Sequence, residues 1–131
     1  MSLNILVVDD SAVMRQMILR VLRMAGLEIG EVHEAGNGRE GLDLLGRHWV
    51  DLVFADINMP EMNGEEMIEK MRAAPETRAT PVIVVSTEGS EARIEKLKGL
   101  DTRFVRKPFT PEQIRQVIQD LTGVKHESTV G

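Results

Sequence analysis

The sequence contains no cysteine among its 131 residues. This absence excludes disulfide bonds, thiolate metal sites and cysteine nucleophiles. It is compatible with a reducing compartment, and we expect the protein to act in the cytoplasm.

Long apolar runs and basic blocks are also missing. No stretch approaches the roughly 18 consecutive apolar residues that a membrane-spanning helix needs, so we expect no membrane insertion. The N-terminal apolar run meets two acids by residue 10, which does not fit a signal peptide. The net charge of −5 and the lack of a basic block argue against direct nucleic-acid binding.

The chain does have enough apolar residues for one core. At 131 residues and 42% hydrophobic content, it has the size and composition of a single domain. We find no internal repeat and no linker. We expect one domain over residues 1–123 and a frayed C-terminal tail over 124–131, where no periodic pattern is present.

Five short apolar runs alternate with five helical patterns. We expect strands at residues 5–8, 32–35, 50–55, 81–85 and 102–105. We expect helices over about residues 11–25, 37–46, 63–74, 90–98 and 110–121. The mixed pattern of 32–35 places that strand at an edge. Alternation at this spacing predicts an α/β fold, in which right-handed βαβ units build a parallel sheet covered on both faces.

Helix starts are marked by polar residues. Ser11 or Asp10 can cap the first helix. Three further helices begin with a pair at the spacing of a capping box: Asn37 with Glu40, Asn63 with Glu66, and Thr110 with Gln113.

Several conspicuous residues receive a structural interpretation. The Met14 and Met17 stripe is assigned to the core, and Trp49 is expected to pack at the start of the third strand. The three histidines are scattered along the chain, and no pairing makes them catalytic: His33, His48 and His126.

Four of the five expected strands end in a reactive side chain. The first strand ends at Asp9 and Asp10, the third at Asp56, the fourth at Ser86 and the fifth at Lys107. In open α/β sheets the binding crevice lies beyond the carboxyl ends of the strands. If these four strands are neighbours, three acids, a hydroxyl and a lysine converge.

This combination constrains the chemistry. Carboxylates a few ångströms apart raise one another's pKa unless a cation joins them. A set of oxygen ligands suits Mg²⁺, and Mg²⁺ beside an aspartate favours phosphoryl transfer. Asp56 stands alone on the central strand and is the candidate nucleophile, which would form an aspartyl phosphate. Asp9 and Asp10, a pair at a helix start, are better placed as metal ligands.

Each of these residues also has a purely structural interpretation. Asp10 could serve only as a helix cap. Ser86 could be an ordinary strand terminus, and Lys107 a solvated surface charge. These interpretations do not explain why all the reactive groups occur at strand ends.

Four motifs resemble those of bacterial response-regulator receiver domains, in particular the stand-alone chemotaxis type. They are VVDDS at 7–11, DINMPEMNG at 56–64, VVST at 84–87 and KPF at 107–109. The resemblance covers about residues 3–122. It implies a doubly wound (βα)5 flavodoxin-like sandwich with a parallel five-stranded sheet of order 2-1-3-4-5.

The resemblance implies a switch driven by phosphorylation. Asp56 would accept a phosphoryl group from a histidine kinase or a histidine phosphotransfer protein. Asp10 and Asp56 would bind Mg²⁺ directly, Asp9 would bind it through water, and Asn58 would add its backbone carbonyl. Lys107 would contact the phosphoryl group.

Further roles follow from the same resemblance. Ser86 would bind a phosphoryl oxygen and form a switch pair with Phe104, which stands where many members have tyrosine. Thr87 is larger than the residue common at its position and would crowd the movement of Phe104. Asn58 and Glu88 would tune the phosphoryl lifetime, and their polarity predicts a short one.

The resemblance also implies an output surface formed by the fourth helix, the fifth strand and the fifth helix. Its expected members are Glu88, Arg93, Arg103, Arg106 and Gln113, each of which could equally be an ordinary solvated polar residue. We expect this surface to bind a separate downstream protein, which the sequence does not identify. We expect a monomer, with a dimer of the phosphorylated form as the alternative. The only catalysis expected is self-phosphorylation and self-dephosphorylation of Asp56, so the protein is not classed as an enzyme.

Three other functions remain to be weighed. A Mg²⁺-dependent phosphatase with an aspartyl-phosphate intermediate would use the same groups, but usually has an Asp-x-Asp pair and a cap domain. A flavodoxin-like cofactor binder needs a phosphate loop and aromatic residues, which DDSAVMR does not provide. A pseudo-receiver that only binds partners would not need the complete acid, serine and lysine set.

Overall fold

The structure is a computed structural model that describes residues 2–57, 59, 61–86, 91–107 and 109–122. The predicted roles of Asn58, Thr87 and Glu88 fall outside these residues, and so does the expected tail over 124–131. Among the described residues, none of the helices has the length and apolarity that crossing a bilayer requires.

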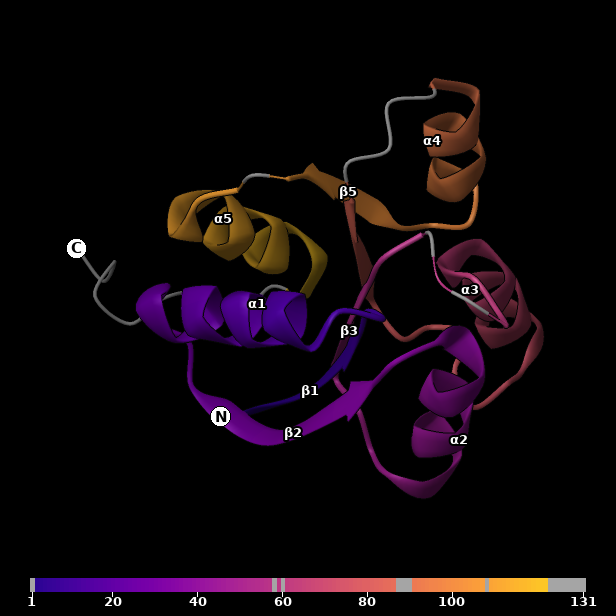
Figure 1. The fold of residues 1–131 in the computed structure, drawn as a ribbon, viewed down its shortest axis with the longest axis horizontal. Helices are drawn as coiled ribbons and strands as arrows, with labels where there is room; N and C mark the ends of the chain where they lie inside the picture. The colour runs from indigo at the N-terminus through magenta and orange to yellow at the C-terminus, as the bar shows by residue number, and fades with distance from the viewer. Residues whose placement is uncertain (1, 58, 60, 87–90, 108, 123–131) are drawn as a thin grey trace.

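Five strands alternate with five helices, as the sequence predicts (Figure 1). The strands are β1 (Leu3–Val8), β2 (Ile29–Ala35), β3 (Leu52–Ala55), β4 (Val82–Ser86) and β5 (Arg103–Arg106). The helices are α1 (Ala12–Met24), α2 (Gly38–Arg47), α3 (Gly64–Ala73), α4 (Glu91–Lys98) and α5 (Pro111–Thr122).

The strands form one parallel sheet in the order β2-β1-β3-β4-β5. This confirms the predicted fold class and strand order, and the edge position of the second strand. β1 pairs with β2 on one side and with β3 on the other, where Val8 lies opposite Ala55. The ends of β1 and β3 are therefore level, next to each other in the middle of the sheet.

The apolar runs are buried on both faces of the sheet because helices cover each face. Alternate residues of β1 enter different cores: Ile5 and Val7 join the first, while Leu6 and Val8 join the second. Helices α1 and α5 cover the first core, and α2, α3 and α4 cover the second (Figure 1). This two-layer cover is what a continuous apolar strand requires.

Most predicted helix starts are confirmed. The Asn63 and Glu66 pair forms a reciprocal capping box. Thr110 and Gln113 exchange the same two bonds at the start of α5. Asn37 accepts from the Glu40 amide, but the Glu40 carboxylate accepts from the Gly36 amide rather than from that of Asn37, so this box is shifted by one residue. 

The predictions for Met17 and Trp49 were wrong. The side chain of Met17 is 50% exposed, and Leu19 is buried instead. On a helix of 3.6 residues per turn, Leu19 shares the sheet-facing side with Ile18 and Leu22, whereas Met17 lies on the opposite side of Ile18. Trp49 is 74% exposed, and its indole N–H donates to Oδ1 of Asp51 at 2.8 Å.

The description of the histidines as scattered was also wrong for two of them. The rings of His33 and His48 stack with centroids 4.1 Å apart. The limits of some strands also differ from the predicted ones. β2 begins three residues earlier than predicted, β3 begins two residues later, and β5 ends one residue later. Edge strand β2 carries few apolar residues, so the sequence pattern indicated only the C-terminal half of the strand.

Candidate functional site

The carboxyl ends of four adjacent strands meet along one edge of the sheet. Asp9 follows β1, Asp56 follows β3, Ser86 ends β4 and Lys107 follows β5. Backbone bonds continue the sheet there: the Asp56 amide donates to the Val8 carbonyl at 3.0 Å, and the Lys107 amide donates to the Ser86 carbonyl at 3.0 Å. The strand order thus places the predicted residues at neighbouring positions.

Three acids form a cluster at this edge. Asp9, Asp10 and Asp56 each offer a carboxylate oxygen, and these oxygens lie within 4.8 Å of one another. Asp9 is buried, Asp56 is half-buried and Asp10 is exposed. The cluster therefore opens to solvent on the side of Asp10.

Asp9 is held by several contacts. Its Oδ1 accepts from the Ser11 amide at 2.9 Å, and its Oδ2 accepts from Nζ of Lys107 at 3.4 Å. Its backbone carbonyl accepts from Nη1 of Arg15 at 2.6 Å. Burial raises the pKa of the Asp9 carboxyl above its ordinary value of 3.8, against the opposing effects of the Ser11 amide and Lys107. The negative charge of Asp56 adds to the rise.

The two oxygens of Asp56 have different surroundings. Oδ1 accepts from the amide of Ile57 at 2.7 Å. Oδ2 lies 3.8 Å from Nζ of Lys107. Lys107 thus lies beside both Asp9 and Asp56, and Oδ2 is the Asp56 oxygen that faces its charge.

Backbone hydrogen bonds close the loop after Asp56 and tie it to the start of α2. The Gly64 amide donates to the Ile57 carbonyl at 3.0 Å, and the Gly38 amide donates to the Met62 carbonyl at 2.9 Å. At Gly64 the backbone passes so close to the carbonyl oxygen of Asp56 that a Cβ would collide with it. Only glycine fits there, and α3 begins at this residue.

The cap of α1 is Ser11, whose hydroxyl accepts from the Met14 amide at 3.2 Å. The interpretation of Asp10 as a helix cap is therefore wrong. Its carboxylate instead belongs to the acidic cluster.

Ser86 and Phe104 lie on one face of the sheet. Phe104 pairs with Val84 in the register of β4 and β5, and Ser86 pairs with Arg106 two residues further on. Successive strand residues point to opposite faces, so all four share the face of the second core. Phe104 packs partly against that core, and the Arg106 guanidinium carbon lies 5.9 Å from the Phe104 ring centre.

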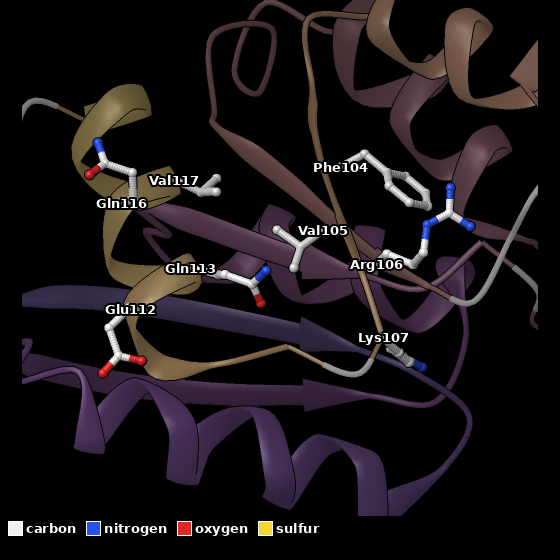
Figure 2. A pocket seen from close by; sticks show the side chains of 8 residues that line it. All are labelled: Phe104, Val105, Arg106, Lys107, Glu112, Gln113, Gln116 and Val117. Carbon is white, nitrogen blue, oxygen red and sulfur yellow. The ribbon is translucent and has the colours of Figure 1, made fainter.

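A pocket of about 680 Å³ lies between β5 and α5. Figure 2 shows Phe104 and Arg106 on one side of β5, with Val105 on the other side toward Gln113 and Val117 of α5. The predicted members Arg106 and Gln113 of the output surface thus line the same pocket.

The donor set of the acidic cluster fits Mg²⁺. Its groups are all oxygens, which is the ligand type that Mg²⁺ prefers. If all three carboxylates are ionised, the one lysine ammonium beside them leaves two negative charges uncompensated. A divalent cation would balance them, whereas a neutral ligand would not.

The residues that orient Asp9 were not predicted from the sequence. The Ser11 amide bond to Asp9 spans two residues, a pattern that aspartate commonly forms with its own backbone, so DDS carried a usable signal. Arg15 also bonds Glu34 of β2 at 2.8 Å, and this contact depends on the sheet order and had no local signal.

The comparison with protein families agrees with this geometry. The model of the response regulator receiver domain matches residues 5–119. The chain belongs to this family. It is a receiver domain of the CheY type, and this membership is consistent with two-component signalling.

Similar receivers are named as chemotaxis proteins. A CheY homolog of Campylobacter jejuni is 40% identical over 92% of this chain and 93% of its own length. CheY of Thermotoga maritima is 36% identical over 93% of this chain and 99% of its own length. The solved structure of Vibrio cholerae CheY4 superposes with a TM-score of 0.80 at 32% identity, covering 92% of this chain and 99% of that one.

Proposed function

We propose that this receiver domain is a chemotaxis-type response regulator that accepts a phosphoryl group on Asp56. The observation that carries the proposal is the meeting of three acids with Lys107 at the strand ends. We assign residues 1–123 to the domain and 124–131 to a tail. The names of the similar proteins support a role in chemotaxis. We also propose that the protein acts in the cytoplasm.

In the proposed reaction, Asp56 attacks the phosphorus of a phosphohistidine on a histidine kinase or phosphotransfer protein. The new bond forms to Oδ2, because Oδ1 is engaged by the Ile57 amide. The phosphorus–nitrogen bond breaks, and its electron pair returns to the imidazole. Lys107 would donate to the phosphoryl oxygens from its position next to Oδ2.

Asp9, Asp10 and Asp56 are the residues that would hold Mg²⁺, and the backbone carbonyl of Asn58 remains a predicted further ligand. When bound, Mg²⁺ would supply positive charge that offsets the charge of the phosphoryl oxygens. Asn58 and Glu88 remain predicted to set the lifetime of the phosphoryl group.

The proposed output begins at Ser86. Its hydroxyl would bind a phosphoryl oxygen, and Phe104, on the same face of the sheet, would move toward the space that Ser86 leaves. The surface of α4, β5 and α5 would then bind a downstream protein. The chemistry of the receiver domain itself would be limited to phosphorylation and dephosphorylation of its own Asp56.

The proposal is tested by incubation with acetyl phosphate, with and without Mg²⁺. The intact mass should rise by one phosphoryl group only when Mg²⁺ is present. Asp56→Asn should abolish the rise, whereas Asp43→Asn, which changes an exposed aspartate of α2, should leave it intact. A phosphorylated Asp56→Asn protein would contradict the assignment.

A further inference from the structure

A second group of metal-binding side chains lies on the outer strand of the sheet. Glu31 and His33 of β2 and His48, the residue that caps the end of α2, bring one ligand atom each within 4.8 Å of one another. The group combines two imidazoles with one carboxylate, unlike the acidic cluster.

The fold explains why these residues meet. Glu31 and His33 are two positions apart on a strand, so their side chains leave the same face. His33 pairs with Leu6, which faces the second core, and that face is covered by α2. The last turn of α2 therefore lies over the strand and sets His48 against His33, with the two rings stacked.

One polar atom of the group, Nε2 of His33, is buried without a hydrogen-bond partner among the described residues. It lies 3.4 Å from Oε1 of Glu31, but the contact lacks hydrogen-bond geometry. Buried polar atoms without a partner are rare and call for a ligand, a water or an ion.

The separation of these two atoms suits a shared metal ion. Zinc binds imidazole nitrogen and carboxylate oxygen at about 2.0–2.2 Å, which places tetrahedral neighbours about 3.3–3.6 Å apart. Imidazole ligands favour zinc and its neighbours over Mg²⁺, which prefers oxygen. The rings of His33 and His48 are only 23° from parallel, so their nitrogens do not point at one position. Binding of one ion by both therefore requires the exposed His48 ring to turn out of the stack.

We infer that Glu31, His33 and His48 form a binding site for a divalent transition metal such as Zn²⁺. The site is separate from the acidic cluster: His33 lies beside Leu6, which is three residues before Asp9, or about 10 Å along β1. Three protein ligands leave a position open for water or for a ligand from a partner.

The site is tested by titrating the full chain with Zn²⁺ against a chromogenic chelator. Excess Mg²⁺ is present throughout, so that the acidic cluster does not take up Zn²⁺. One Zn²⁺ should bind with low-micromolar or tighter affinity, and the imidazole nitrogen resonances of His33 and His48 should shift together. Trp49 is the single tryptophan and directly follows His48, so bound Cu²⁺ should quench its fluorescence.

The matched variants are His48→Gln and His126→Gln. His48 is exposed, so its replacement should not disturb folding, and it should weaken Zn²⁺ binding at least about tenfold. His33→Gln should do the same, with circular dichroism as the folding control. His126→Gln removes the third histidine and should leave the affinity unchanged. Saturation only at millimolar Zn²⁺, or equal affinity in His48→Gln, would overturn the inference.

Discussion

Nζ of Lys107 lies 3.4 Å from Oδ2 of Asp9, although the two residues are 98 positions apart in the sequence. Both side chains are largely buried, with 14% and 2% exposed. A buried carboxylate that loses its partner keeps the cost of leaving water without the compensating attraction. The contact therefore ties the first strand to the last and affects stability as well as chemistry.

Replacement of Lys107 by methionine should expose this dependence. Without Mg²⁺, Lys107→Met should lower the free energy of unfolding by about 1–3 kcal/mol, because the Asp9 carboxylate is left unpaired. Urea denaturation measures the loss. The control Lys70→Met removes an exposed lysine of α3 and should stay within about 0.5 kcal/mol of the wild type. Equal stability of the two variants would contradict the prediction.

Removal of the Asp9 charge should have the opposite effect. The pKa of Asp9 is raised in the folded protein, so the folded state binds the proton more tightly than the unfolded state. Stability is then lost as the pH rises from the ordinary value of 3.8 through the folded pKa. Asp9→Asn avoids this loss and keeps an acceptor for the Ser11 amide.

Without divalent cations, Asp9→Asn should therefore be more stable than the wild type at neutral pH. The difference should shrink as the pH falls toward 3.8. Denaturation curves at several pH values measure it, and Lys107→Met in the Asp9→Asn background should cost less than in the wild type. Lower stability of Asp9→Asn at neutral pH would show that the attraction to Lys107 outweighs the burial of Asp9.

Phe104 pairs with Val84, which lies two residues before Ser86 on the same face of the sheet, and this arrangement predicts a switch that can be followed at Phe104. With fluorine-labelled phenylalanine, the Phe104 resonance should shift on phosphorylation, while that of the fully buried Phe54 should move little. Ser86→Ala should reduce the shift at equal phosphorylation, because no hydroxyl moves toward the phosphoryl group. An unchanged resonance shift in Ser86→Ala would mean that the movement of Phe104 does not depend on Ser86.

The fold could be predicted because its signals are local. The β1 run Ile5 to Val8 is apolar at every position, as burial on both faces requires, and capping boxes such as Asn63 with Glu66 fix helix starts. The exposed Met17 was misassigned because helical periodicity alone does not say which side of Ile18 faces the sheet. The neighbouring helices and the sheet decide this.

The site could be predicted in part for the same reason. Parallel strands deliver their last residues to one edge, so Asp9, Asp56 and Lys107 could be grouped from the strand ends alone. The stack of His33 on His48 could not, because it depends on how α2 crosses β2. The approach of Gly64 to the Asp56 carbonyl could not be predicted either, because hydrophobic periodicity gives no information on such a close backbone contact.

Two glycines give a matched test of that contact. Gly64→Ala should destabilise the protein by about 1–3 kcal/mol or more, because the new methyl group meets the Asp56 carbonyl oxygen. Gly46→Ala, in α2, meets nothing within 4 Å and should stabilise the helix by about 0.5–1 kcal/mol. Phosphorylation by acetyl phosphate should slow in Gly64→Ala alone. Equal stability of the two variants would mean that the loop relaxes around the added methyl group.

Arg72 of α3 should stabilise the fold through the hydrogen bonds of its planar guanidinium group. Nε donates to the Leu100 carbonyl at 2.7 Å, Nη1 to the Thr80 carbonyl at 2.8 Å and Nη2 to the Asp101 carbonyl at 3.1 Å. These bonds join α3 to the segments that lead into β4 and β5. Lysine keeps the charge, but its single nitrogen cannot reach carbonyls on three sides.

Arg72→Lys should therefore lower the free energy of unfolding by at least about 2–3 kcal/mol, since hydrogen bonds from a charged group are each worth about 1.5–3 kcal/mol and more than one is lost. Arg39→Lys, at an exposed position of α2, is the control and should change stability by less than about 0.5 kcal/mol. Hydrogen exchange should quicken most at Leu100 and Asp101, because their turn loses its anchor. A uniform change across the chain would mean that Arg72 contributes by packing rather than by holding these carbonyls.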